Sequence, residues 1–212
     1  MTENNNEEKI EKSKQGERAS LALQIPIEEQ ENSLRVLILQ HPQEPDKILG
    51  TAPLCVRILK NAKLKVGLSW PSLSKALGSE ATAANWGVLY LGGSGKAGKL
   101  SQEVNVLTKK MTPCSQEEIS SLHGIVVIDG TWSQAKAMWW RNAWFLKLKR
   151  IVLQPKTKSR YGNLRKEPRR ECLSTIESVA LCLRSLDKNP AIANSLEKSF
   201  EEMLALYRAQ KK

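Results

Sequence analysis

The stretch of sequence that most constrains the fold is residues 124–144, which read GIVVIDGTWSQAKAMWWRNAW. The first five residues are apolar and mostly β-branched, which predicts a buried strand of a parallel sheet. The strand ends at Asp129, after which Thr131 and Gln134 fit the capping box that opens a helix. Because open α/β sheets hold ligands at the carboxyl ends of their strands, we expect Asp129 to lie at a ligand site.

Similar patterns alternate along the rest of the chain. Short apolar runs predict further strands at residues 35–40, 63–69, 86–91 and 150–154. Helical spacing and capping signals predict helices over residues 51–61, 131–146, 174–186 and 191–208. This alternation predicts an α/β fold with a mainly parallel sheet covered by helices on both faces. In the helix after Asp129, two apolar stripes place Trp139, Trp140 and Trp144 in the core, with Trp132 in the first turn as the exception.

Charge is unevenly distributed between the N-terminal residues and the rest. Residues 1–33 are rich in Glu, Asn, Gln, Lys and Ser, which predicts a disordered acidic tail before a single domain at 34–212; the apolar residues from Leu21 to Ile27 leave open a docked piece at its end. The formal net charge of the chain is +11, and residues 1–33 contribute −4, which leaves +15 for residues 34–212. So basic a domain predicts a polyanionic partner, most commonly nucleic acid.

The basic residues are densest in residues 141–170. This segment holds eleven Lys or Arg and a single acid, Glu167. Such a density predicts contact with RNA, because the positive charges repel one another when no polyanion is near. The expected RNA-binding residues are Arg141, Arg160, Tyr161, Arg165, Lys166, Arg169 and Arg170.

A glycine-rich stretch at residues 92–99, GGSGKAGK, comes close to two nucleotide-binding patterns. A phosphate loop needs Ser or Thr after its lysine, and Leu100 follows Lys99 here. A dinucleotide fingerprint needs a helix directly after its third glycine, and residues 99–106 have poor helical periodicity. The stretch is more typical of a lid over a ligand at the end of the strand before it.

Cysteine usage and hydropathy limit the remaining classes. Cys55, Cys114, Cys172 and Cys182 are scattered, with two histidines in the chain, which favours buried reduced thiols over a metal site. The N-terminus has no apolar signal region, and no apolar stretch is long enough to cross a membrane. We therefore expect a cytoplasmic protein with no metal and no membrane association.

Residues 129–135, DGTWSQA, resemble the D-x-T-W signature of the DTW-domain family of tRNA-uridine aminocarboxypropyltransferases. Further similar segments follow the family's order over residues 35–185. They are Gln40-His41-Pro42 with Glu44, residues 50–52, residues 88–92, Tyr161, Leu164-Arg165-Lys166 with Pro168, and residues 173–175 with Glu177 and Ala180. Many family members have a cysteine cluster near the N-terminus, and this chain lacks it. Any RNA binding that the cluster provides in those members must come from other residues here.

The resemblance implies a knotted, SPOUT-type sheet and S-adenosylmethionine as cofactor. It places the cofactor against Leu89, Tyr90, Leu91, Gly92, Asp129, Thr131, Trp132, Ser133, Gln134, Leu173, Ser174 and Thr175. It also implies transfer of the 3-amino-3-carboxypropyl group to N3 of an unpaired uridine in tRNA, with ribosomal RNA as second choice. Because N3 of uracil is protonated at neutral pH, a general base is needed; Asp129 is the first candidate, with Glu44 or His41 as substitutes.

Several alternatives remain open at this level. Asp129 and Thr131 fit equally well as turn and cap residues, and a second capping box fully explains Ser174 and Glu177. A SPOUT-like RNA methyltransferase would use the same cofactor and partner, whereas a non-catalytic RNA-binding protein would need only the basic surface. A nucleotide-phosphate enzyme would use the glycine-rich stretch. The oligomeric state is open.

Overall fold

The computed structural model describes residues 21–211 except 46, 91–99, 101 and 165–172. Its strands form one six-stranded sheet in the order β2-β1-β5-β3-β6-β4. Their bounds are β1 Arg35–Gln40, β2 Ala62–Val66, β3 Trp86–Leu89, β4 Val104–Leu107, β5 Gly124–Asp129 and β6 Lys149–Leu153. All neighbouring pairs are parallel except β4 and β6, which are antiparallel. The predicted α/β fold with a mainly parallel sheet is confirmed, whereas the short edge strand β4, only four residues long, was not predicted.

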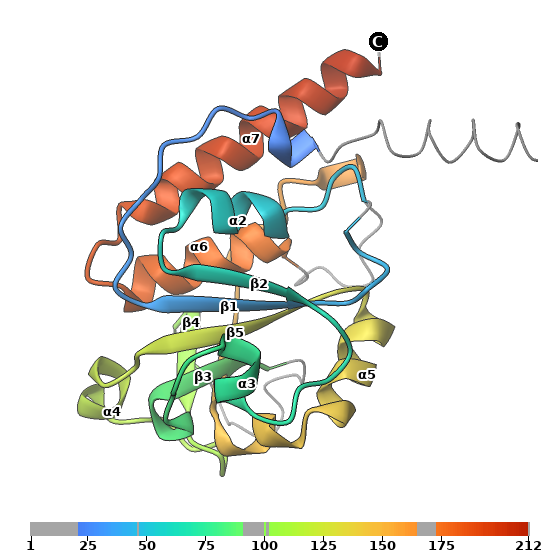
Figure 1. Cartoon of the computed structure of the whole chain (residues 1–212). Helices are drawn as coiled ribbons and strands as arrows, with labels where there is room; N and C mark the ends of the chain where they lie inside the picture. Colours follow the sequence, from blue (N-terminus) through green and yellow to red (C-terminus); the bar gives the residue numbers. More distant parts are fainter. Residues whose placement is uncertain (1–20, 46, 91–99, 101, 165–172, 212) are drawn as a thin grey trace, which may run out of the picture.

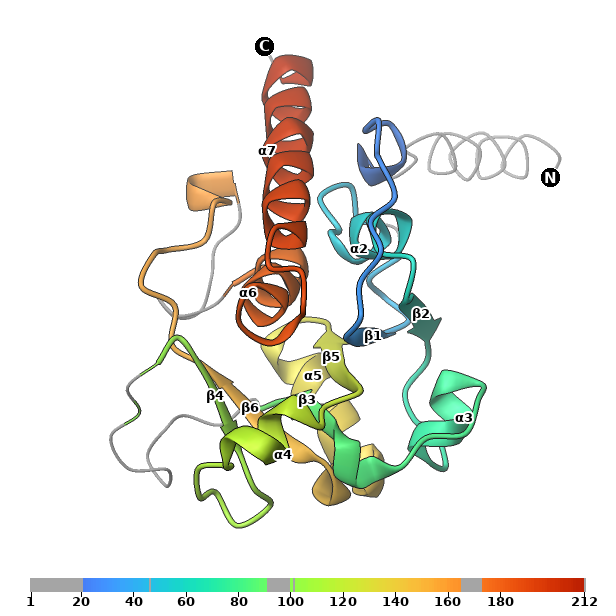
Figure 2. The same cartoon turned by 90° about the vertical axis from the view of Figure 1, so that its left-hand side faces the viewer.

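Helices cover both faces of this sheet, as predicted (Figure 1). The α-helices are α2 Ala52–Ile58, α3 Leu73–Leu77, α4 Gln116–Ser120, α5 Trp132–Arg141, α6 Thr175–Leu186 and α7 Ile192–Gln210. The 3-10 helices are η1 Leu21–Leu23, η2 Ala83–Asn85, η4 Ala143–Lys147 and η5 Gly162–Leu164. On one face α2, α6 and α7 pack together, and on the other lie α3 and α5 (Figures 1 and 2).

Alternation along the central strands divides the core into two clusters. Val36 and Ile38 of β1 face the cluster that contains α2, α6 and α7. Leu37 and Leu39 of the same strand face the cluster that contains α3, Met138 of α5 and η4. Since successive side chains of a strand point to opposite faces, a continuous apolar run marks a strand that is buried on both.

The helix predicted over residues 131–146 is shorter than expected, because α5 ends at Arg141. Asn142 is buried and donates its side-chain amide to the Leu68 carbonyl (2.9 Å) and the Met138 carbonyl (2.7 Å). The chain then continues as the 3-10 helix η4, which turns Trp144 into the core. The prediction that Trp140 belongs to the core is wrong: its side chain is 81% exposed.

Residues 21–33, which we expected to belong to a disordered tail, are packed against the domain. Leu21, Ala22 and Ile25 are buried, and the guanidinium of Arg57 in α2 donates to the carbonyls of Ala22 and Ile25. The apolar residues in this segment provide the surface that docks it. Residues 1–20 lie outside the described part of the chain.

Candidate active site

The carboxylate of Asp129 joins three elements at the carboxyl edge of the sheet. Gln40 and Asp129, the last residues of β1 and β5, lie opposite each other in the parallel register. The Gln40 side-chain amide donates to Asp129 Oδ2 at 2.8 Å, and the Thr175 hydroxyl, at the start of α6, donates to Asp129 Oδ1. The His41 amide donates to the Asp129 carbonyl at 2.9 Å, which continues the ladder past both strands. Asp129 is therefore more than the turn residue that its sequence position alone would require.

Two long helices begin beside this carboxylate. In α5, the Gln134 amide donates to Thr131 Oγ1 (3.3 Å) and the Thr131 amide donates to Gln134 Oε1 (2.6 Å), which confirms the predicted capping box. The start of α6 lies at the same place, since Thr175 is its first residue. The positive ends of two helix dipoles therefore meet at Asp129, and such ends favour anionic ligand groups.

The second predicted capping box also forms, and it does more than cap α6. Glu177 accepts from the Ser174 amide (2.8 Å) and the Ser174 hydroxyl (2.6 Å). The same carboxylate accepts from the Ser159 hydroxyl and the Arg160 amide, both at 2.7 Å. Buried Glu177 thus ties the segment around residues 159–160 to the start of α6.

Tyr90, directly after β3, brings a third strand end to this edge. Its amide donates to the Ile151 carbonyl at 2.8 Å, and its ring meets Trp139 edge-on with 5.5 Å between centroids. Tyr90, Trp132 and Asp129 are each only partly buried. The carboxyl edge therefore carries an aromatic ring directly after β3, an indole in the first turn of α5 and a carboxylate at the end of β5.

The other predicted cofactor residues divide into four groups, which are exposed, buried, partly buried or outside the described part of the chain. Thr131 and Ser133 are exposed at the start of α5, whereas Ser174 is buried. Leu89, Leu173, Thr175 and Gln134 are partly buried at the same edge. Leu91 and Gly92 lie outside the described residues, as does the predicted lid at residues 92–99.

The predicted RNA-binding residues differ in their exposure and in their partners. Tyr161 must be corrected: it is 1% exposed, its hydroxyl donates to the Leu49 carbonyl (2.6 Å) and its ring packs on Phe200, so it is inaccessible to a base. Arg160 is held by Glu197 and Glu201, both at 3.0 Å, and is therefore already neutralised by protein carboxylates. Arg141 is exposed at the end of α5. Arg165, Lys166, Arg169 and Arg170 lie outside the described residues.

The two alternative general bases are more restricted than Asp129. Glu44 is buried and pairs with Lys47 at 2.6 Å. Nδ1 of His41 accepts from the Gln43 amide at 3.2 Å, so the neutral imidazole carries its proton on Nε2. An ionised carboxylate has about four lone-pair sites, and the two bonds to Asp129 use two of them. These two bonds therefore leave room for a further hydrogen bond to the Asp129 carboxylate.

Sequence reasoning did not assign a site role to two residues that the structure brings to this edge. Gln40 is 1% exposed, and its side-chain amide contacts Asp129. The hydroxyl of buried Thr51, ahead of α2, accepts from the Ile176 amide of α6 at 3.3 Å. Both belong to segments that resemble the DTW family. Gln40 could have been found because it ends a strand predicted to lie in the same parallel sheet as β5.

Cys55 and Cys182 are buried, as predicted, whereas Cys114 is only partly buried and Cys172 lies outside the described residues. Burial, and next the nearby charge of Asp129, raises the pKa of the Cys55 thiol well above its ordinary value. Burial also raises the pKa of Cys182 to about 12. Both thiols are therefore protonated at neutral pH and are poor nucleophiles.

Neither a candidate metal site nor a membrane-spanning helix is present among the described residues. No group of three or more His, Cys, Asp or Glu side chains in the described part of the chain could hold a metal ion. Among the same residues, no helix is long and apolar enough to cross a membrane.

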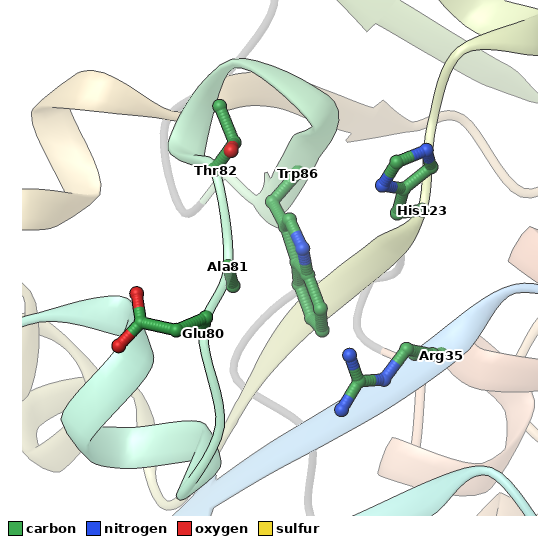
Figure 3. A pocket seen from close by; sticks show the side chains of 6 residues that line it. All are labelled: Arg35, Glu80, Ala81, Thr82, Trp86 and His123. Carbon is green, nitrogen blue, oxygen red and sulfur yellow. The ribbon is translucent and has the colours of Figure 1, made fainter.

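A polar cavity of about 230 Å³ lies at the opposite, amino edge of the sheet (Figure 3). Its lining includes Arg35 and Trp86, the first residues of β1 and β3, and His123, just before β5. Glu80, Ala81 and Thr82 complete the lining. The cavity is thus separated from Asp129 by the length of the central strands.

Comparison with known proteins identifies the family of this chain. The model of the DTW domain matches residues 19–208. The chain is 33% identical over 171 residues to a protein of Macaca fascicularis named tRNA-uridine aminocarboxypropyltransferase 2, covering 77% of this chain and 51% of that protein. The mouse protein of that name is 30% identical over 174 residues, covering 81% and 54%, and the Drosophila melanogaster protein is 29% identical over 173 residues, covering 77% and 61%.

The present chain spans about half the length of the two mammalian relatives. No solved structure matches it significantly. The domain match covers most of the chain, including every described element that meets at Asp129. The chain therefore belongs to the DTW-domain family.

Proposed function

We propose that this protein transfers the 3-amino-3-carboxypropyl group of S-adenosylmethionine to N3 of an unpaired uridine in tRNA. The observation that carries the proposal is the placement of Asp129, tied to Gln40 and Thr175, where α5 and α6 begin. The proposal is also supported by the relatives of this chain, which are named tRNA-uridine aminocarboxypropyltransferase 2. The name belongs to those relatives, and its extension to this chain is our proposal.

The side chains at the carboxyl edge fit S-adenosylmethionine chemically. A sulfonium cation is stabilised by a carboxylate and by the face of an indole, which Asp129 and Trp132 offer on partly buried side chains. The starts of α5 and α6 suit the carboxylate of the amino acid moiety. Leu89 and Tyr90 with Leu173 supply apolar contacts for the nucleoside. When bound, S-adenosylmethionine supplies a carbon activated by its sulfonium and leaves as methylthioadenosine.

In this proposal Asp129 takes the proton from uracil N3 as the new N–C bond forms and the C–S bond breaks. Gln40 and Thr175 fix the carboxylate in one orientation by donating one hydrogen bond to each oxygen. A base held in this way keeps its lone pairs directed toward the proton that it accepts. General bases positioned like this raise reaction rates by about 10²–10⁴-fold. Further acceleration comes from alignment of N3 with the reacting carbon.

The RNA partner follows from the charge of the chain and the chemistry of the acceptor. A uridine whose N3 is accessible is unpaired, which fits a loop of tRNA better than a duplex. Residues 34–212 carry a net +15, so phosphates contribute strongly to binding. Among the described cations, Lys136 and Arg141 are exposed on the helix that starts at the site.

The family resemblance also implies a knotted connection, which we include in the proposal. Residues 91–99 and 165–172, which follow Tyr90 and precede Leu173, lie outside the described residues. The parallel sheet and the convergence of α5 and α6 at one edge are compatible with such a connection. A crystal structure that traces both segments would test it directly.

The decisive experiment incubates purified protein with unmodified tRNA and S-adenosylmethionine and analyses the nucleosides by mass spectrometry. We expect aminocarboxypropyl-uridine from the wild type and its loss in Asp129→Asn. Methylated nucleoside in its place would overturn the reaction and support the methyltransferase alternative. RNA binding without any adduct would support the non-catalytic alternative, and an adduct on ribosomal RNA alone would overturn the choice of tRNA.

A further inference from the structure

The outer face of α5, which we define as Ser133, Lys136, Trp140 and Arg141, carries a feature that a catalytic site does not require. Trp140 is 81% exposed, the highest value among the large apolar side chains of the described residues. The neighbouring Trp139 points inward, where its ring lies 5.3 Å from the guanidinium of Arg150. One helix therefore carries one indole in the interior and the next in solvent.

Charge on the outer face of α5 has one sign. Lys136 and Trp140 are four residues apart and so are neighbours on the helix surface, and both are exposed. Arg141 follows Trp140 and is also exposed. No Asp or Glu occurs anywhere between Gly130 and Lys166 in the sequence. An exposed aromatic ring flanked by cations and free of local acids is complementary to a single-stranded polyanion whose monomers carry flat rings.

The position of this face relates it to Asp129. Trp140 follows Trp132 by eight residues, which is about 12 Å of helix rise at 1.5 Å per residue. At 3.4 Å per stacked nucleotide, this distance corresponds to roughly three to four nucleotides. Ser133 and Trp140 lie seven residues apart on the same side of the helix, so a continuous surface leads from the start of α5 to Trp140.

We infer that the outer face of α5 binds the single-stranded RNA next to the target uridine, with Trp140 stacking on a base and Lys136 and Arg141 contacting phosphates. The inference rests on the proposed function, which supplies the RNA. In this inference, α5 binds the part of the RNA that lies a few nucleotides from the modified base. A segment of another protein could also pack on the Trp140 ring, but it would have to supply acidic groups opposite Lys136 and Arg141.

The test compares Trp140→Ala and Trp140→Phe with the wild type. Binding of unmodified tRNA and of a single-stranded RNA oligonucleotide is measured by fluorescence anisotropy, and KM and kcat for tRNA are measured by nucleoside analysis. Because loss of a base–aromatic stack weakens binding by at least about fivefold, we expect Kd and KM to rise by that factor in Trp140→Ala with kcat unchanged. Trp140→Phe should retain most of the affinity.

Lys136→Gln provides an independent test of RNA binding by the same face. Each phosphate contact contributes about 0.7–0.9 to the slope of log Kd against log salt concentration, so we expect the slope to fall by about that amount. Leu23→Ala is the matched control, because Leu23 is 56% exposed in η1, far along the chain from α5, and should change neither Kd nor KM.

The outcomes separate this inference from the proposed function. If the wild type modifies tRNA and Trp140→Ala leaves Kd and KM unchanged, the inference is overturned and the proposed function stands. If the wild type forms no adduct, the proposed function fails, and the anisotropy data alone decide whether Trp140 binds RNA. A change of sedimentation mass in Trp140→Ala, with RNA binding intact, would instead assign the face to a second copy of the chain and overturn the inference.

Discussion

The two edges of the central sheet gather similar side chains but differ in how those side chains are held. At the amino edge, Trp86 is 1% exposed and the guanidinium of Arg35 covers its ring at 5.7 Å. At the carboxyl edge, Trp132 is partly exposed, and Asp129 accepts bonds from β1 and α6. An aromatic ring, an acid and a histidine are found at both, so the residue types alone do not distinguish them.

Chain direction explains the difference. In a parallel sheet crossed over by helices, the helices that follow the strands begin at the carboxyl edge, where their positive ends and exposed amides attract ligands. Both α5 and α6 begin there, beside Asp129. The amino edge has a cavity of about 230 Å³, but neither α5 nor α6 begins there. The direction of the strands therefore favours the carboxyl edge as the candidate site.

The largest expected effect concerns the amino edge and tests whether Trp86 is structural. Its fully buried ring packs against Gly124, where an added Cβ would lie 2.6 Å from the indole. Trp86→Ala should lower the free energy of unfolding by about 3–5 kcal/mol, as for other large core truncations, measured by urea denaturation. The fraction that remains folded at low temperature should keep wild-type activity. Loss of activity in that folded fraction would show that Trp86 at the amino edge also takes part in function.

At the carboxyl edge, Asp129→Asn should reduce kcat for aminocarboxypropyl transfer by about 100-fold or more, since an amide cannot accept the N3 proton. This factor corresponds to about 2.7 kcal/mol in the activation free energy. The measurement is the initial rate of adduct formation at saturating tRNA. Asp187→Asn is the matched control: Asp187 follows the far end of α6, and its carboxylate accepts from the Leu34 amide at 2.7 Å. Equal activity losses in both variants would argue against a special role for Asp129.

Thr175→Val tests the bond between α6 and the carboxylate with a smaller expected effect. Loss of the hydroxyl leaves Asp129 Oδ1 without this donor and loosens its orientation, so we expect kcat to fall by about tenfold, or about 1.4 kcal/mol. KM for tRNA should change little. Thr175→Ser keeps a hydroxyl and should restore most of kcat; if Ser behaves like Val, packing of the methyl group and not the hydrogen bond is what matters.

The smallest effect is expected for His123→Ala at the amino edge. The side chain is exposed, and its backbone bonds to Asn85 and Arg35 do not depend on the imidazole. We expect kcat/KM to change by less than about twofold and stability by less than about 0.5 kcal/mol, as for other exposed substitutions. A larger loss of kcat/KM in steady-state assays would show that the amino-edge cavity takes part in function.

Much of the fold follows from local patterns. The apolar run before Asp129 predicted β5, and the capping boxes at Thr131 and Ser174 predicted where α5 and α6 begin. These features concern residues close together in the chain, whose hydrogen bonds and periodicity are encoded locally. The edge strand β4 was not predicted, and it is held in the sheet by antiparallel pairing with β6, a segment far away in the chain. The end of α5 depends on contacts of Asn142 with Leu68, which lies 74 residues away.

The candidate site was predicted in its local part and missed in its long-range part. The resemblance and the strand pattern both led to Asp129, but its partner Gln40 is 89 residues away and became a neighbour because β1 and β5 are adjacent in the sheet. Tyr161 was expected on the RNA surface, because a tyrosine among basic residues is typical of such surfaces. Its ring is instead buried against Phe200 of α7.

By itself the sequence determined the alternation of strands and helices, the polar strand end at Asp129 and the excess of positive charge. Only the tertiary structure decided that Gln40 and Thr175 share one carboxylate, that Tyr161 is interior and that Trp140 faces solvent. The physical reason is that periodicity fixes which side of an element is apolar, whereas the order of strands and the contacts of each helix end decide what that side meets. Two adjacent tryptophans in α5 show this, since Trp139 packs partly buried against the core whereas Trp140 is exposed to solvent.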